Sequence, residues 1–296
     1  MKKFVNHNSK RKAERLPSDN ELSERHGSRR RILELTSAPG AVVAETLSTL
    51  IDGFGSIAPS AAWTPRGATA PITVRIDEAS GIIKNPSHKT ALHEWWTGPD
   101  VSSAAAVPPI DDGMRRRLYG ASRLPARLPL FDFAGALEGD GLLIVSAAAH
   151  IGELNSDHSH QREKAALPQI KRALAEASDG WNAILTAHAD NYGFKLSHRV
   201  KLSTDSHCRL SYNFALAWKL AQLGIPTVLL YLGFLDALEL EPDGRLTFRD
   251  HEMWIKCVSE KTSKPLPEEI WDMEFQVPGG AKIAVLRRSM RFDLPE

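Results

Sequence analysis

Apolar runs and turn residues alternate in the second half of the chain in a way that predicts a β-hairpin. Residues 128–133 form a short apolar run that contains one acid, Asp132. A tight acidic glycine turn follows at residues 138–141, and residues 142–149 are then apolar throughout. Two such runs joined by a glycine turn are typical of paired antiparallel strands.

Two amphipathic helices are expected after the hairpin. In residues 161–177, Leu167, Ile170 and Leu174 share one helical face. Pro168 predicts either a kink or a helix that begins later, near Leu167. Residues 210–223 give the second helix, which Gly224 and the following proline end.

Residues 227–235 are the clearest buried strand, because nine nearly all apolar residues follow one another. A helix is expected at 250–260 and a last strand at 282–286. The order hairpin, helix, helix, strand, helix, strand predicts an α/β fold with a mixed central β-sheet flanked by helices.

The first half of the chain carries weaker signals. A short helix is expected at 41–51, a strand at 72–76 and a helix at 88–96. Residues 1–38 combine many charges with few aromatic residues, which predicts a mostly disordered basic arm. We therefore divide the chain into this arm (1–38), an N-terminal helical and loop subregion (39–127) and an α/β core (128–296).

Charge is unevenly distributed although the formal net charge is only +1. Residues 1–31 contain ten Lys or Arg and four Asp or Glu residues, a net charge of +6, so the remainder carries −5. A basic arm on an acidic body could contact phosphates or another acidic partner, or could simply be solvated.

The remaining composition indicates an intracellular protein. No apolar run reaches the length of a membrane span, and the N-terminus has no apolar core typical of a secretion signal. Cys208 and Cys257 are far apart and lack metal-binding spacing, so we expect buried free thiols in a bacterial-type cytoplasm.

The hairpin is also the best candidate for chemistry. An acid in the first strand and residues at i, i+2 and i+4 of the second would face one side of the sheet. These positions are Asp132, Ser146, Ala148 and His150, with 13 residues between the first two. In such an arrangement, paired carboxylates bind Mg²⁺ and a lysine activates water against a phosphodiester.

The segment LFDFAGALEGDGLLIVSAAAHIGELNS, at residues 130–156, resembles the catalytic hairpin of bacterial PD-(D/E)XK nuclease-like proteins. The similarity continues through a helix that contains Asn213 and the strand GIPTVLLYLGFLDA. It implies a restriction-endonuclease-like core, Mg²⁺ as cofactor, a metal-binding role for Asp132, and nucleic acid, in particular DNA, as partner.

Two positions depart from that pattern. Ser146 stands where the resemblance implies Glu, and Ala148 where it implies Lys, so the site loses a negative charge and the group that orients water. Loss of one such proton-transfer group typically costs about 10²–10⁴ in rate. The chain could be an engineered inactive nuclease or a natural pseudo-enzyme. Alternatively, its reactive groups have moved to residues just downstream: His150, Glu153, Glu163 and Lys164.

Other candidate residues have plain structural alternatives. His158 and His160 could bind zinc or lie in a solvated turn, and Trp95 and Trp96 could stack on bases or pack in the core. Asn213 could brace the site, and Glu94 could be a relocated metal ligand. The run at 115–117 could contact phosphate.

The sequence thus predicts a metal-dependent DNA nuclease in an inactivated or degenerate form. The alternative is a non-catalytic pseudo-nuclease that binds nucleic acid or protein. No membrane partner is expected, and a protein partner or a homo-oligomer is open. No Walker, GxGxxG or GxSxG motif occurs.

Overall fold

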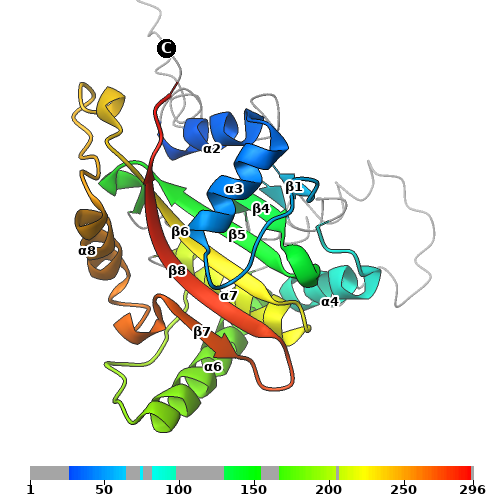
Figure 1. The fold of residues 1–296 in the computed structure, drawn as a ribbon. Helices are drawn as coiled ribbons and strands as arrows, with labels where there is room; N and C mark the ends of the chain where they lie inside the picture. Colours follow the sequence, from blue (N-terminus) through cyan, green and yellow to red (C-terminus); the bar gives the residue numbers. More distant parts are fainter. Residues whose placement is uncertain are drawn as a thin grey trace, which may run out of the picture.

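The protein forms a mixed β-sheet with helices on both faces (Figure 1). The computed structural model describes residues 27–64, 74–75, 82–97, 130–154, 167–204 and 207–294. The α-helices in these ranges are α2 Ser28–Ser37, α3 Gly40–Leu50, α4 Pro86–Thr97, α6 Leu167–Tyr192, α7 Cys208–Gln222 and α8 His251–Thr262. The strands are β1 Trp63–Thr64, β2 Val74–Arg75, β3 Leu130–Phe131, β4 Phe133–Ala136, β5 Leu142–Ala148, β6 Thr227–Leu235, β7 Met273–Gln276 and β8 Lys282–Arg291.

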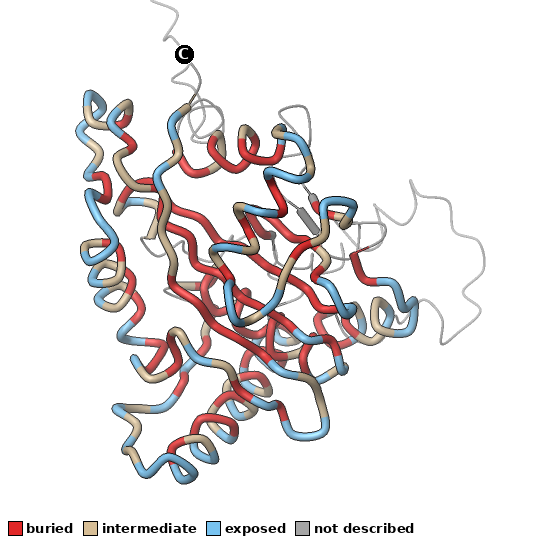
Figure 2. The backbone as a smooth tube through the Cα atoms, viewed as in Figure 1, coloured by how far each residue is buried: buried red, intermediate tan, exposed pale blue. Residues whose placement is uncertain are grey.

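The main sheet has six strands in the order β1-β4-β5-β6-β8-β7. Its centre, β5-β6-β8, is parallel, while β1, β4 and β7 pair antiparallel to their neighbours. Strands β2 and β3 form a separate antiparallel pair. Parallel strands are typically covered on both faces. The burial of all of β5, of β6 up to Phe234 and of residues 283–287 in β8 agrees with this (Figure 2).

Strand alternation divides the apolar interior into two clusters. On β5, Leu142, Ile144 and Ala148 pack with residues of α4, α6, α7 and α8. Leu143 and Val145 face the other side, where they pack with residues of α2 and α3. The period of two along each strand therefore decides which helices a side chain meets.

The α/β class is confirmed, and so is an antiparallel strand pair around the turn at 138–141, although its first strand is Phe133–Ala136 and not 128–133. The order of the later elements is as predicted except for β7, which was not expected. The predicted strand at 227–235 is β6 residue for residue, and the helix at 210–223 is α7 shifted by two residues at its start and one at its end. The helices expected at 41–51, 88–96 and 250–260 are α3, α4 and α8.

Three predictions need correction. The arm expected to be disordered through residue 38 ends in α2, whose Ile32 and Leu35 are buried against the sheet. The helix predicted to end at residue 177 continues to Tyr192; its start at Leu167, with Pro168 in the first turn, confirms the later of the two starts that were left open. The last strand extends to Arg291 instead of ending at residue 286.

Two general expectations can be compared directly with the structure. Neither cysteine forms a disulfide; Cys208 is buried, as expected, whereas Cys257 is partly exposed. Within the described ranges, no helix combines the length and the apolar character needed to cross a lipid bilayer.

Candidate functional site

The sequence predicts Asp132 inside a strand, but the structure places it at a break between β3 and β4. Phe131 before it packs on the α6/α7 side of the sheet, whereas Phe133 after it packs on the α2/α3 side. The Asp132 backbone N–H donates to the Val145 carbonyl at 3.1 Å. Its carboxylate Oδ2 accepts the Ala147 N–H at 2.7 Å. The break therefore holds the carboxylate against β5.

A buried polar row crosses the sheet at this level. Phe133 pairs with Val145, which brings Asp132 beside Ser146. Ser146 is the β5 partner of Tyr231 on β6, and Tyr231 is the partner of Arg287 on β8. All four polar members of this row are buried. Because partners in neighbouring strands share a face, the row lies under α7 and α8.

Arg209, in the first turn of α7, forms an ion pair with Asp132 through its Nη2 and the carboxylate Oδ2. The Asp132 side chain is 8% exposed and the Arg209 side chain 37%. The positive charge beside this acid therefore comes from the chain itself.

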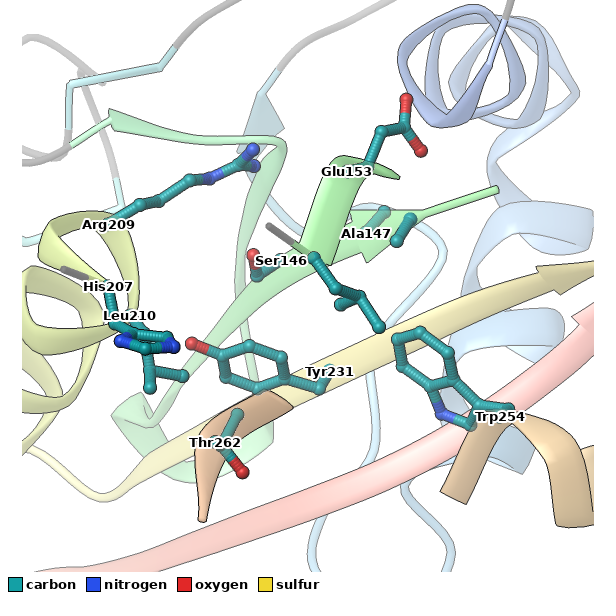
Figure 3. Close-up of a pocket in the computed structure, with 11 residues that line it drawn as sticks. Ser146, Ala147, Glu153, His207, Arg209, Leu210, Tyr231, Trp254 and Thr262 are labelled. Atoms are coloured by element: carbon teal, nitrogen blue, oxygen red, sulfur yellow. The ribbon is translucent and has the colours of Figure 1, made fainter. Parts of the chain in front are cut away.

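Glu153 is one of the residues predicted to replace the missing catalytic groups, but its carboxylate accepts hydrogen bonds from the backbone. It lies in the short helix Ile151–Leu154 after β5. Its Oε2 accepts the Ala149 N–H at 2.5 Å and its Oε1 accepts the Ser28 N–H at 3.3 Å. Figure 3 shows its carboxylate turned away from Ser146, toward the start of α2. This side chain joins the end of β5 to α2.

His150 continues β5 in sequence but belongs to a different set of contacts. Its Nδ1 accepts the Gly152 N–H at 3.0 Å, and its Nε2 lies 3.0 Å from Nη1 of Arg245. Burial lowers the pKa of His150; the nearby Glu153 carboxylate opposes that shift and the Arg245 guanidinium adds to it. The ring is therefore held neutral and is not among the residues that line the cavity described next.

A cavity of about 50 Å³ lies between the polar row on the sheet, the start of α7 and the side of α8 that faces the sheet (Figure 3). Sequence reasoning identified three of its lining residues, Ser146, Ala148 and Glu153. It missed His207, Arg209 and Tyr231, which come from other elements. The remaining lining residues are Ala147, Leu154, Leu210, Trp254 and Thr262.

The residues present do not fit the Mg²⁺ ion that the resemblance implies. Mg²⁺ takes oxygen ligands, with carboxylates contributing most of the charge. In the described part of the chain, no group of three or more His, Cys, Asp or Glu side chains is arranged to hold a metal. The one acid at the expected position is paired with Arg209, and its neighbours Ser146 and Ala148 bring no charge.

The other sequence candidates fall into two sets. Trp95 and Trp96 are buried in the core, and Glu94 is exposed on α4 away from the cavity. Asn213 is fully buried on α7. Outside the described residues lie the run at 115–117 and the positions His158, His160, Glu163 and Lys164.

Comparison with known proteins adds no family to this picture. No protein-family model, no curated protein and no solved structure matches the chain.

Proposed function

We propose that this chain is a non-catalytic, nuclease-like binding protein whose ligand is nucleic acid, with DNA as the first candidate. The observation that carries the proposal is the ion pair of Arg209 with Asp132. A metal-dependent nuclease needs a net negative pocket that attracts a divalent cation. Here a guanidinium neutralises the only acid among the four hairpin positions 132, 146, 148 and 150.

Several features support binding in place of cleavage. Ser146 and Ala148 line the cavity at the two positions where the resemblance implies the second acid and the lysine. Loss of one positioned proton-transfer group, the role that the resemblance implies for the lysine, typically costs about 10²–10⁴ in rate. Glu153, which could have replaced one of them, already accepts two backbone N–H groups.

Nucleic acid is the favoured ligand class for two reasons. The sequence resemblance implies it, and residues 1–30, which leave out the buried and paired Arg31, carry a net charge of +5. Lys and Arg side chains near phosphates release condensed counterions, so such binding weakens steeply as salt rises.

The test measures binding and cleavage in the same samples. The full chain is titrated into fluorescently labelled single- and double-stranded DNA at 50 and 200 mM salt, with either Mg²⁺ or EDTA, and anisotropy is recorded before the products are separated on a gel. We expect salt-dependent binding that EDTA leaves unchanged, and intact DNA in every lane.

Two variants sharpen the result. Arg209→Met should weaken binding, while Lys282→Met, a charge loss at the start of β8, serves as the matched control.

Cleavage by the unmodified chain that EDTA abolishes would refute the proposal and support the metal-dependent nuclease. DNA that stays unbound at low salt would refute it as well. If Ser146→Glu/Ala148→Lys creates Mg²⁺-dependent cleavage, the site derives from a nuclease.

A further inference from the structure

The start of α7 forms one wall of the cavity. His207, Arg209 and Leu210, from the N-cap and first turn of this 15-residue helix, all line it. The first turn carries no acidic residue, and the His207 side chain does not cap the helix. The N-terminal end of a helix bears a partial positive charge and is a favourable position for an anion.

Tyr231 provides an independent sign of a ligand. Its side chain is 5% exposed, and its buried hydroxyl has no hydrogen-bond partner in the described part of the chain. Figure 3 shows this hydroxyl directed toward His207 and Leu210 at the start of α7. A buried hydroxyl left without a partner is costly, so its position indicates a group that the cavity accepts.

Further polar atoms lie in the cavity wall or, for Asn213, beside Tyr231 behind it. His207 has a buried Nδ1 without a partner, and both amide atoms of Asn213 are equally unsatisfied among the described residues. Burial raises the pKa of Tyr231, an effect that the Arg209 guanidinium and the Asn213 amide oppose, so its hydroxyl keeps the proton and acts as a donor. Ser146 adds a second hydroxyl to the wall.

Size and charge restrict the ligand. One water molecule occupies roughly 10–15 Å³ by the measure that gives this cavity about 50 Å³. The space therefore accommodates a few waters or one tetrahedral oxyanion, but not a nucleoside. A phosphodiester carries nucleosides on two sides, whereas a terminal phosphate carries one. Since Arg209 neutralises Asp132, the helix end and the donors remain to attract negative charge.

We propose that the cavity binds the terminal phosphate monoester of a nucleic-acid strand. Tyr231 and Ser146 donate hydroxyl hydrogen bonds to it, and the N-terminal end of α7 attracts its charge, while Arg209 neutralises the nearby Asp132 carboxylate that would repel it. This inference rests on the proposed function, because it names the part of the nucleic acid that the site selects.

The test compares oligonucleotides that differ only at the end. Anisotropy titrations use one labelled sequence with either a 5′-phosphate or a 5′-hydroxyl, and a second pair with the 3′ end varied. We expect about tenfold tighter binding for one phosphorylated end, the typical contribution of one charge-assisted hydrogen bond. Inorganic phosphate should compete with it.

Tyr231→Phe is the decisive variant because it keeps the ring and removes the hydroxyl. It should abolish the preference for a phosphorylated end and change the thermal midpoint little, since only the Asn213 amide lies near the hydroxyl and the two form no hydrogen bond of good geometry. Tyr192→Phe, at an exposed tyrosine at the end of α6, is the control and should retain the preference.

The outcomes separate this inference from the proposed function. Equal affinity for phosphorylated and unphosphorylated ends, or a preference that survives Tyr231→Phe, overturns the inference and leaves nucleic-acid binding intact. If no oligonucleotide binds but inorganic phosphate raises the thermal midpoint of the unmodified chain and not of Tyr231→Phe, nucleic-acid binding is overturned and a phosphate site supported. If neither binds, both proposals fail.

Discussion

The ion pair between Asp132 and Arg209 can be measured directly by a double-mutant cycle. The cycle uses Asp132→Asn, Arg209→Met and the double variant. Asparagine keeps an oxygen that can accept the Ala147 N–H, and methionine keeps much of the arginine stem, so each single change mainly removes charge. The cycle is needed because Arg209 makes further interactions that its removal would also lose.

The expected coupling energy follows from the burial of the two side chains. Hydrogen bonds to charged groups contribute about 1.5–3 kcal/mol, and breaking a fully buried pair costs about 3–5 kcal/mol. The Arg209 side chain is 37% exposed, which moves the value toward that of surface pairs, so we expect about 2 kcal/mol. Arg209→Met should cost more than Asp132→Asn, because it leaves a charge on the more deeply buried partner.

Urea unfolding followed by the fluorescence of the seven tryptophans provides the free energies of unfolding. The double variant should be little less stable than Arg209→Met alone. A coupling energy below about 0.5 kcal/mol would refute the reasoning. The carboxylate would then be available to a cation, and the main argument against a metal site would be lost.

Three further predictions concern stability. Glu239→Gln should cost about 3 kcal/mol and Arg31→Met about 1 kcal/mol in urea unfolding. The reason is that the Arg31 side chain is 2% exposed and would keep its charge without its bidentate partner, whereas the Glu239 side chain is 32% exposed. A larger loss of stability for Arg31→Met than for Glu239→Gln would contradict this. The thermal midpoint should fall as the pH drops below about 6.5, because the pKa of His150 is lowered on folding and the unfolded chain then binds the extra proton. His150→Gln should reduce that slope, and an unchanged slope would count against the assignment. Gly233→Ala should cost about 1–3 kcal/mol, since its Cβ would lie 2.5 Å from Cδ2 of Trp254. The double variant Gly233→Ala/Trp254→Leu should lose less stability than the sum of the two single losses, because leucine removes the ring that the new Cβ would meet. Losses that add fully would argue against the clash.

Local patterns were sufficient to predict the elements of the sheet core. Residues 227–235 are apolar and rich in β-formers, and β6 has those bounds because both of its faces are covered. The helix α6 was predicted too short. Its apolar face continues through Trp181, Ile184 and Leu185, but Asp179 and Gly180 are residue types typical of a turn. Tertiary packing kept the helix intact across them.

The arm was misjudged for a related reason. Residues 1–38 contain few apolar residues, among them Ile32 and Leu35, and many charged ones. A segment of this composition resembles a disordered one. Their burial depends on contacts with β5 and on the Arg31–Glu239 pair, whose members are 208 residues apart. A helix of ten residues is marginal alone, so α2 owes its stability to these distant partners.

The site was predictable only along a single strand. Alternation placed Ser146 and Ala148 on one face, and both line the cavity. Arg209 is 77 residues from Asp132, and Tyr231 reaches Ser146 only through parallel pairing, so neither contact could be derived from spacing. The pairing that cancels the acid's charge was therefore not visible in the hairpin sequence.

The strongest reason to regard this cavity as a binding site is that its unsatisfied Tyr231 hydroxyl lowers the stability of the fold. A sheet face that packs against α7 and α8 is most stable when it presents apolar side chains. Tyr231 instead places a hydroxyl there without a partner among the described residues, where phenylalanine would keep the same ring contacts with Phe214 and Trp271. An unsatisfied buried group costs about 1–3 kcal/mol, which is a large fraction of a typical domain's stability. Residues that lower stability in this way are concentrated at functional positions. The hydroxyl is thus better explained by a ligand that completes its hydrogen bond than by packing.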